Sequence, residues 1–367
     1  MRRILGIILT ILAGIAASIA CLLLFWSPGT IRPVLDANGN PRPNGVSEKI
    51  LVNINGVQQG MFIRSSDIAH PVLLYLHGGP AMPTYFLEQR YPTGLEQDFT
   101  IVWWEQRGAG LSYSSDILPE TMTVQQMVAD TVAVTDYLRD RFGKEKIYLM
   151  GHSWGSFIGI KAAAQSPQRY HAYIGVGQIT NQLESERLAY EHMLNAFKAQ
   201  GNAKMVRKLE TASFERKVPL PDSYVAIRDT AMHTLGVGTT RKMRSVISGV
   251  FLPVWQDREY TLREKINIWR GKWSESSARL WNQLLAADVT LEVPRLDVPV
   301  YFLHGRYDYT VSRGLAKAYL QQLKAPQKGF YTYEDSAHSP IFEEPERTRA
   351  ILVKDVLTGT SSQSDVE

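Results

Sequence analysis

Short apolar runs alternate with longer amphipathic segments along most of the chain. The runs lie at 71–76, 100–104, 147–150, 172–176, 298–303 and 328–333. Continuous apolar runs of this length are typical of parallel strands that are buried on both faces. Val124–Phe142 instead has the periodicity of a helix. The alternation predicts an α/β fold with a mostly parallel sheet flanked by helices.

The pattern changes before the first run and again after the fourth. Lys49–Ile54 and Gly60–Ile63 flank Asn55-Gly56, which predicts a hairpin ahead of the parallel strands. From Gln178 to about Leu291 the chain is charged, rich in Trp and helical in pattern, which predicts an inserted cap. The expected organisation is a linker at 27–46, a core at 47–177 and 293–357, a helical cap at 178–292 and a polar tail at 358–367.

The N-terminal segment is the most apolar part of the chain. No charge occurs from Ile4 to Trp26, and as a helix with ~1.5 Å rise per residue this span would cover a bilayer core. A cleaved signal peptide is the alternative, but its apolar region would be only ~7–15 residues long. We therefore expect a transmembrane anchor at 4–26. Arg2 and Arg3 predict a cytoplasmic N-terminus and a single pass that leaves the body extracytoplasmic.

Composition narrows the classes of function. The net charge is +4, and the sequence has no basic block interleaved with aromatic residues. Nucleic-acid binding is therefore not predicted. The single cysteine, Cys21, lies in the apolar segment, so a disulfide framework and a Cys-rich metal site are excluded. The sequence implies no metal and no organic cofactor, and it leaves the oligomeric state open.

Gly151-His152-Ser153-Trp154-Gly155 carries the first chemical signal. It stands between an apolar run and a helical segment, which is the context of the G-x-S-x-G nucleophile elbow. A sharp turn there exposes the serine hydroxyl, and glycine on either side lets the strand and the helix pass closely. Ser153 is therefore the candidate nucleophile.

A serine needs a base, and the base needs an orienting group. In hydrolases with this elbow the chain order is Ser, then Asp or Glu, then His. Asp308 and His338 each follow a predicted late strand, so they complete a candidate Ser-Asp-His triad. Asp297 precedes its strand, and Asp335 is too near His338 in sequence to come from a separate strand end.

His77-Gly78-Gly79-Pro80 follows the strand predicted at 71–76, where this type of fold places an oxyanion donor. The expected donors are the backbone N–H groups of Gly79 and Trp154, with Gly78 as the alternative to Gly79. Pro80 is excluded because it has no N–H.

These motifs, with Glu105–Ser112 and His304–Asp308, resemble the proline iminopeptidase branch of the α/β hydrolases. The resemblance covers about 48–177 and 293–356, and it implies an α/β-hydrolase fold and a serine aminopeptidase activity. Ala81 stands where the family pattern has glycine, and Glu105 stands where it has aspartate. Glu105 and Arg107 are expected to brace loops. The resemblance also implies acidic cap residues that bind a substrate α-amine, for which the first cap helix offers Glu184, Glu186 and Glu191.

Three hypotheses of function follow. The first is a membrane-anchored serine hydrolase that acts through an acyl-enzyme, as an aminopeptidase on short peptides. The second is a carboxylesterase or amidase on small acyl substrates that needs no free amine. The third is a binding protein on a hydrolase scaffold, which the complete triad disfavours.

Overall fold

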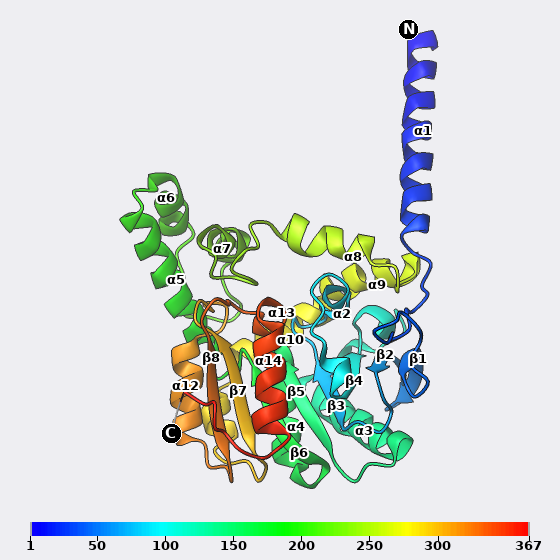
Figure 1. Cartoon of the computed structure of the whole chain (residues 1–367). Coiled ribbons are helices and arrows are strands. Elements are labelled where there is room, and N and C mark those ends of the chain that lie inside the picture. The colour runs from blue at the N-terminus through cyan, green and yellow to red at the C-terminus, as the bar shows by residue number, and fades with distance from the viewer. Residues whose placement is uncertain (1, 366–367) are drawn as a thin grey trace.

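The computed structural model describes residues 2–365, so residues 366–367 of the predicted polar tail lie outside the described residues. An eight-stranded sheet forms the centre of the body (Figure 1). Its strands run in the order β1-β2-β4-β3-β5-β6-β7-β8. In chain order they are β1 (Val46–Ile54), β2 (Val57–Ser65), β3 (Val72–Leu76), β4 (Thr100–Glu105), β5 (Ile147–His152), β6 (Tyr170–Val176), β7 (Val300–Gly305) and β8 (Lys328–Tyr333).

The sheet is mostly parallel, as the sequence predicts. Strands β3 to β8 pair in parallel, whereas β2 is antiparallel to both β1 and β4. The predicted hairpin turn at Asn55-Gly56 joins β1 to β2. A short turn suffices there, while each parallel pair requires a longer crossover.

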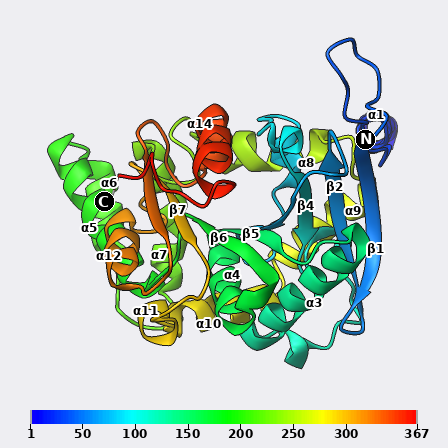
Figure 2. The ribbon, with the colours of Figure 1, turned by 60° about the horizontal axis from the view of Figure 1, so that its bottom comes forward.

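Helices cover both faces of the sheet (Figure 2). Leu74 and Leu76 of β3 contribute to one hydrophobic core, and Leu73 and Tyr75 contribute to the other, because successive side chains of a strand point to opposite faces. The first core is completed by α3 (Val124–Phe142), α4 (Trp154–Gln165) and α12 (Arg313–Gln322). The second includes α2 (Tyr85–Glu88), α13 (Pro340–Glu343) and α14 (Pro345–Ile351), which continues into a π-helical turn at Leu352–Val356.

The region between β6 and β7 is a set of helices that lies over one edge of the sheet (Figure 1). Part of it has its own core, which includes Met193, Phe197, Tyr224 and Met232. The helices are α5 (Gln182–Ala199), α6 (Ala203–Thr211), α7 (Asp222–Leu235), α8 (Leu252–Gln256) with a π-helical turn before it at Ile247–Phe251, α9 (Leu262–Lys272), α10 (Glu275–Ala286) and α11 (Val289–Glu292).

Helix α1 (Arg2–Phe25) projects from the body by itself (Figure 1). Its span Arg3–Phe25 has a mean hydropathy of 2.7 and no buried residue, so it is long and apolar enough to cross a membrane. The segment after α1 is held by the cap. Lys265 Nζ donates to the carbonyl of Trp26 at 2.7 Å, and the backbone of Gly29 bonds to that of Arg258.

Candidate active site

Ser153 stands at the turn between β5 and α4. Its backbone has φ 56° and ψ −121°, a left-handed conformation that is rare for a residue with a side chain. A Cβ at Gly151 would overlap the backbone of Gly155, and one at Gly155 would overlap the carbonyl of Leu76. The two glycines are therefore required by close backbone approach, which holds Ser153 in its strained turn.

Asp308 and His338 meet where β7 and β8 end. His338 Nδ1 lies 2.8 Å from Asp308 Oδ2, and the backbone N–H of Val311 donates to Asp308 Oδ1 at 2.9 Å. Burial by itself would raise the pKa of Asp308. The charges and hydrogen bonds of His338 and His304 outweigh that effect, so the pKa lies below its usual range. Asp308 is therefore a carboxylate that can orient and stabilise the His338 imidazole.

Gly177 connects this pair to the elbow. The N–H of Ser153 donates to the carbonyl of Val176 at 2.9 Å, and the next residue, Gly177, lies against the imidazole of His338. A Cβ on Gly177 would stand 3.0 Å from His338 Cε1 and 3.4 Å from Asp308 Oδ2. Among the described residues, Ser153 Oγ donates no hydrogen bond to His338, and a base–nucleophile bond of this kind commonly tightens only when substrate binds. The structure thus gathers all three predicted triad residues at one edge of the sheet.

Two neighbouring histidines are held neutral. Burial first, and then the charge of His338, lowers the pKa of His152 to about 3, and its Nε2 donates to the carbonyl of His338 at 2.7 Å. Burial likewise lowers the pKa of His77 to about 4. His77 Nε2 accepts from the N–H of Gln106, and the Gln106 side chain also joins the carbonyl of His77 to the indole of Trp154. Both rings therefore position the loops of the site.

The loop that carries Gly78 packs against the candidate nucleophile. An added Cβ on Gly78 would be 3.2 Å from Ser153 Cβ and 3.7 Å from its Oγ, so this loop passes directly over the serine. Within residues 2–365, the N–H groups of Gly78, Gly79 and Trp154 have no hydrogen-bond acceptor. Either glycine can therefore pair with Trp154. Ala81, the departure from the family pattern, adopts φ 56°, a conformation that glycine takes at lower cost.

Glu105 and Arg107 are buried beside the elbow and contact other protein groups, as bracing residues would. Arg107 Nε lies 2.7 Å from Asp130 Oδ2, and its other nitrogen bonds Oδ1. The Glu105 carboxyl accepts from the Tyr260 hydroxyl and from the N–H of Leu111. Burial raises the pKa of Glu105 to about 8.

A cavity of about 360 Å³ opens above Ser153, between the sheet edge and the cap. Gly79 and Pro80 line it from the oxyanion loop, and apolar cap residues line much of the rest. Its charged lining is Arg228, Asp229 and Lys272, with Gln182 beside them. The cap residues that complete the apolar lining include Leu220, Val225, Trp273, Ala278 and Trp281.

None of the three glutamates expected to bind an amine lines this cavity. Glu184 and Glu191 both pair with Arg187 on the outer face of α5. Glu186 is fully buried and forms two hydrogen bonds with the Arg228 guanidinium, at 2.6 and 2.7 Å. The acidic side chain that does line the cavity is Asp229, which also bonds Arg228 at 2.7 Å.

Sequence reasoning missed Asp229 and a cap loop that bonds the segments carrying Asp308 and His338. The carbonyl of Val237 accepts from the N–H of Tyr309, and the carbonyl of Gly238 accepts from the N–H of His338. These two bonds attach the cap to the loops that carry His338, the predicted base, and Asp308, the predicted orienting acid. A bond between backbone groups leaves no pattern of residue types in the sequence, so the cap loop could not have been predicted. Asp229 could have been found by considering every acidic residue of the cap.

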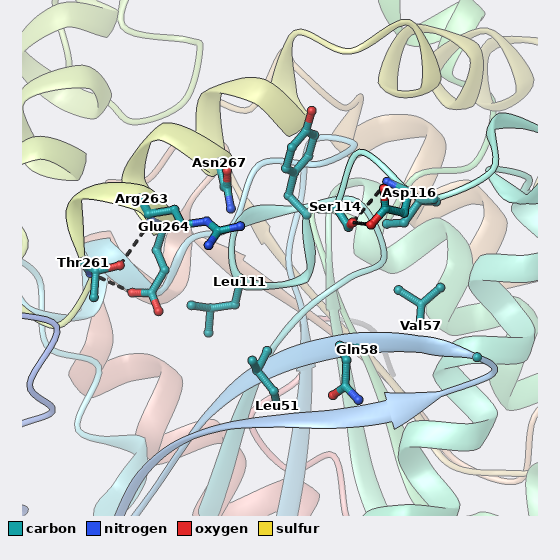
Figure 3. A pocket seen from close by; sticks show the side chains of 13 residues that line it. Leu51, Val57, Gln58, Leu111, Ser114, Asp116, Thr261, Arg263, Glu264 and Asn267 are labelled. Carbon is teal, nitrogen blue, oxygen red and sulfur yellow. Dashed lines mark hydrogen bonds between the residues drawn. The ribbon is translucent and has the colours of Figure 1, made fainter.

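A second cavity, of about 510 Å³, is shown in Figure 3, and it shares no lining residue with the cavity at Ser153. It lies between the β1–β2 hairpin, the loop after β4 and helix α9. Leu51, Leu111 and Asn267 are among its lining residues, and no triad residue belongs to it. Although this cavity is larger, its lining contains no serine near a histidine–carboxylate pair, so the cavity at Ser153 is the better candidate for the active site.

Comparison with known proteins agrees with the observed fold. The sequence model of the alpha/beta hydrolase fold matches residues 71–345. The probable aminopeptidase YbaC of Bacillus subtilis (strain 168) is 33% identical over 80% of this chain and 91% of its own. A proline iminopeptidase of Heyndrickxia coagulans is 20% identical over 77% of this chain and 88% of its own.

Solved structures extend the likeness to the fold. The proline iminopeptidase of Mycobacterium smegmatis superposes with a TM-score of 0.59 at 16% identity, over 85% of this chain and 98% of that one. A membrane phospholipase A superposes with a TM-score of 0.57 at 16% identity, over 98% of this chain and 99% of that one. At these identities the superpositions show a shared fold.

Proposed function

The chain belongs to the alpha/beta hydrolase family and is a hydrolase, and from this premise we propose that it acts as a serine hydrolase through an acyl-enzyme. The observation that carries the proposal is the Asp308–His338 pair after β7 and β8, at the same edge of the sheet as the strained Ser153 after β5. The unpaired N–H groups next to Ser153 add an oxyanion site.

In the proposed reaction, Ser153 Oγ attacks the acyl carbon while His338 Nε2 takes the hydroxyl proton. Asp308 holds His338 with its Nδ1–H toward the carboxylate and stabilises the imidazolium that forms. The N–H of Trp154, together with that of Gly79 or Gly78, binds the oxyanion. His338 then passes its proton to the leaving group, and water releases the acyl group from Ser153 by the same route.

We further propose that the preferred substrate is a short peptide or aminoacyl compound with a free α-amine. The likeness to a probable aminopeptidase over most of both chains supports this choice. In this structure the carboxylate suited to the amine is Asp229, because Glu186 is already paired with Arg228 and the other two glutamates lie outside the cavity. Asp229 remains 61% exposed despite its bond to Arg228, so an ammonium group could reach it.

A carboxylesterase or amidase that needs no amine is the second candidate. It is favoured by the charge balance of the cavity, where Arg228 and Lys272 oppose Asp229. It is also favoured by the apolar lining, which includes Leu220, Trp273 and Trp281. A small apolar acyl group would fit such a lining without an ionic partner.

The serine mechanism is tested with a fluorophosphonate, which reacts with activated serines. We expect the full chain to be labelled and Ser153→Ala to remain unlabelled. Ser156→Ala is a matched control, because Ser156 Oγ is already bonded to the Ser153 carbonyl at 2.6 Å and is not expected to react. Equal labelling of Ser153→Ala and the wild type would refute the mechanism.

The substrate class is tested with paired aminoacyl arylamides, one free and one N-acetylated, beside simple acyl esters. An aminopeptidase should lose most of its turnover when the amine is acetylated. Asp229→Asn should raise KM for the free amine and leave acyl esters unaffected. If the acetylated and free compounds react equally well, the second candidate replaces the first.

We also propose that α1 anchors the chain in a membrane as a single span, with the N-terminus cytoplasmic and the body outside. The length and hydropathy of Arg3–Phe25 and the absence of buried residues within it support this proposal. Carbonate washing of membranes should leave the full-length chain in the pellet, and its recovery in the soluble fraction would refute the anchor.

A further inference from the structure

The cap exposes an unusual amount of apolar surface. Ile247 is 65% exposed and Trp273 72% exposed, and Val246, Phe251 and Leu252 are each at least 37% exposed. We refer to these five residues as the apolar ridge. Contiguous exposed apolar surface on a globular protein generally marks a contact with a partner or a membrane.

Aromatic contacts link Phe251 to Trp273 through Trp269, whose ring is itself buried. The rings of Phe251 and Trp269 lie 5.2 Å apart, and those of Trp269 and Trp273 are stacked at 5.0 Å. Phe251 also contacts Trp255. Tryptophan is enriched where proteins meet the membrane–water interface, because its ring is apolar and carries one polar N–H.

The helix that carries most of the ridge ends beside the end of α1, because Lys265 Nζ bonds the carbonyls of both Trp255 and Trp26. Helix α8 lies crosswise to α1, on the face of the body from which α1 rises (Figure 1). The loop after α8 holds the anchor directly. The Arg258 guanidinium lies over the Phe25 ring at 4.9 Å, and Pro28 forms a bridge with Thr261. A bilayer crossed by α1 would therefore meet this side of the cap first.

The charges around the ridge fit an anionic surface. Between 241 and 273, the exposed charged side chains are all basic: Lys242, Arg244, Arg258, Arg263 and Arg270; the exposed acidic Glu275 follows two residues after Trp273. The acidic residues of this stretch are buried or half-buried, and they have partners within the protein. Glu259 pairs with Arg32, and Glu264 pairs with Lys49. Basic residues that flank exposed apolar side chains are typical of segments that lie in a lipid surface.

We propose that the apolar ridge lies in the surface of the same bilayer that α1 crosses, so that the Ser153 cavity opens at the lipid surface. Trp273 makes this connection, because it belongs to the ridge and also lines the cavity above Ser153. Acyl compounds that partition into the bilayer would then reach the site along the membrane. The inference rests on the proposed anchoring by α1 but not on the choice of substrate.

The ridge position can be measured with a single fluorescent label on the full chain in lipid nanodiscs. Cys21→Ser removes the one native thiol, and Ile247→Cys then gives a unique labelling site on the ridge. Ile68→Cys is the matched control, because Ile68 is 50% exposed. It lies in the loop before β3, at the amino ends of the parallel strands, whereas the cap lies over their carboxyl ends. The Ile247 label should be quenched by nitroxide lipids and protected from iodide, and the Ile68 label should show the reverse.

Three other results would overturn the proposal, and they differ from one another. Quenching of the Ile247 label by iodide, as at Ile68, would place the ridge in water. Protection from both quenchers would indicate a protein partner, such as a second copy of this chain. Failure of the chain to enter nanodiscs would refute the anchor and the inference together.

A second experiment tests access to the cavity. Ser153 is labelled either by a fluorophosphonate on a lipid tail within the bilayer or by one on a water-soluble chain. Ile247→Glu should slow labelling by the lipid-linked probe and leave the soluble probe unchanged, and Ile68→Glu should slow neither. Equal rates for Ile247→Glu and the wild type with the lipid-linked probe would overturn the proposal. If neither probe labels the wild type, the serine mechanism itself fails.

Discussion

Gly177→Ala tests whether a glycine beside the base keeps the triad in place. Gly177 has φ 54°, so a side chain there costs about 1 kcal/mol of backbone strain. The new methyl carbon would also stand 3.0 Å from His338 Cε1 and 3.1 Å from Nδ1. Ordinary carbon contacts begin near 3.5 Å, so the imidazole must retreat by roughly half an ångström.

That displacement has a predictable effect on rate. Moving a reacting group by about 1 Å can lower the reaction rate about 10²-fold. A displacement of about half an ångström should therefore slow the acylation of Ser153 on the order of tenfold. Gly143→Ala is the matched control. Gly143 has φ 58° at the end of α3, and an added Cβ there meets no atom within 4 Å. The Gly143→Ala variant should lose the same stability as Gly177→Ala but keep the wild-type rate of Ser153 acylation.

The two variants are compared by urea unfolding and by the second-order rate of fluorophosphonate labelling. Gly177→Ala should lose about 1 kcal/mol of stability and about tenfold in labelling rate. Gly143→Ala should lose only the stability. If Gly177→Ala is labelled as fast as the wild type, the close contact does not set the position of His338, and the reasoning is wrong.

Three further predictions concern the supporting structure. Asp130→Ala leaves the buried Arg107 guanidinium without its carboxylate, which should cost about 3–5 kcal/mol in urea unfolding; a loss below about 1 kcal/mol would contradict it. Burial raises the pKa of Glu105 to about 8 from 4.5, so the folded state holds a proton that the unfolded state releases. That contribution to stability is complete below about pH 4.5 and is lost as the pH rises through about 8. The urea midpoint of the wild type should therefore fall between these pH values, and Glu105→Gln should make that fall smaller. A fall of the same size in Glu105→Gln would refute the prediction. Lys265→Met removes three hydrogen bonds, to Trp26, Ser27 and Trp255, and should increase limited proteolysis within 27–45, whereas unchanged cleavage would show that the bonds do not hold this segment.

The sequence alone was sufficient for the α/β fold and for the positions of its strands. Continuous apolar runs such as 72–76 and 300–303, alternating with helical segments, are typical of strands buried on both faces of a covered parallel sheet. It was also sufficient to nominate Ser153, Asp308 and His338. Each follows a strand of a parallel sheet, and the carboxyl ends of such strands meet at one edge.

Only the tertiary structure decided what surrounds that edge. The acidic residues of α5 have equivalent sequence signatures, yet Glu186 is buried against Arg228, whereas Glu184 and Glu191 face outward. Asp229 reaches the cavity because α7 packs over it. Helix packing in the cap determines these outcomes through contacts between residues far apart in the chain, and periodicity within one helix does not encode them. The apolar ridge likewise becomes visible only when the cap is folded beside the end of α1, because exposure is a property of the assembled surface.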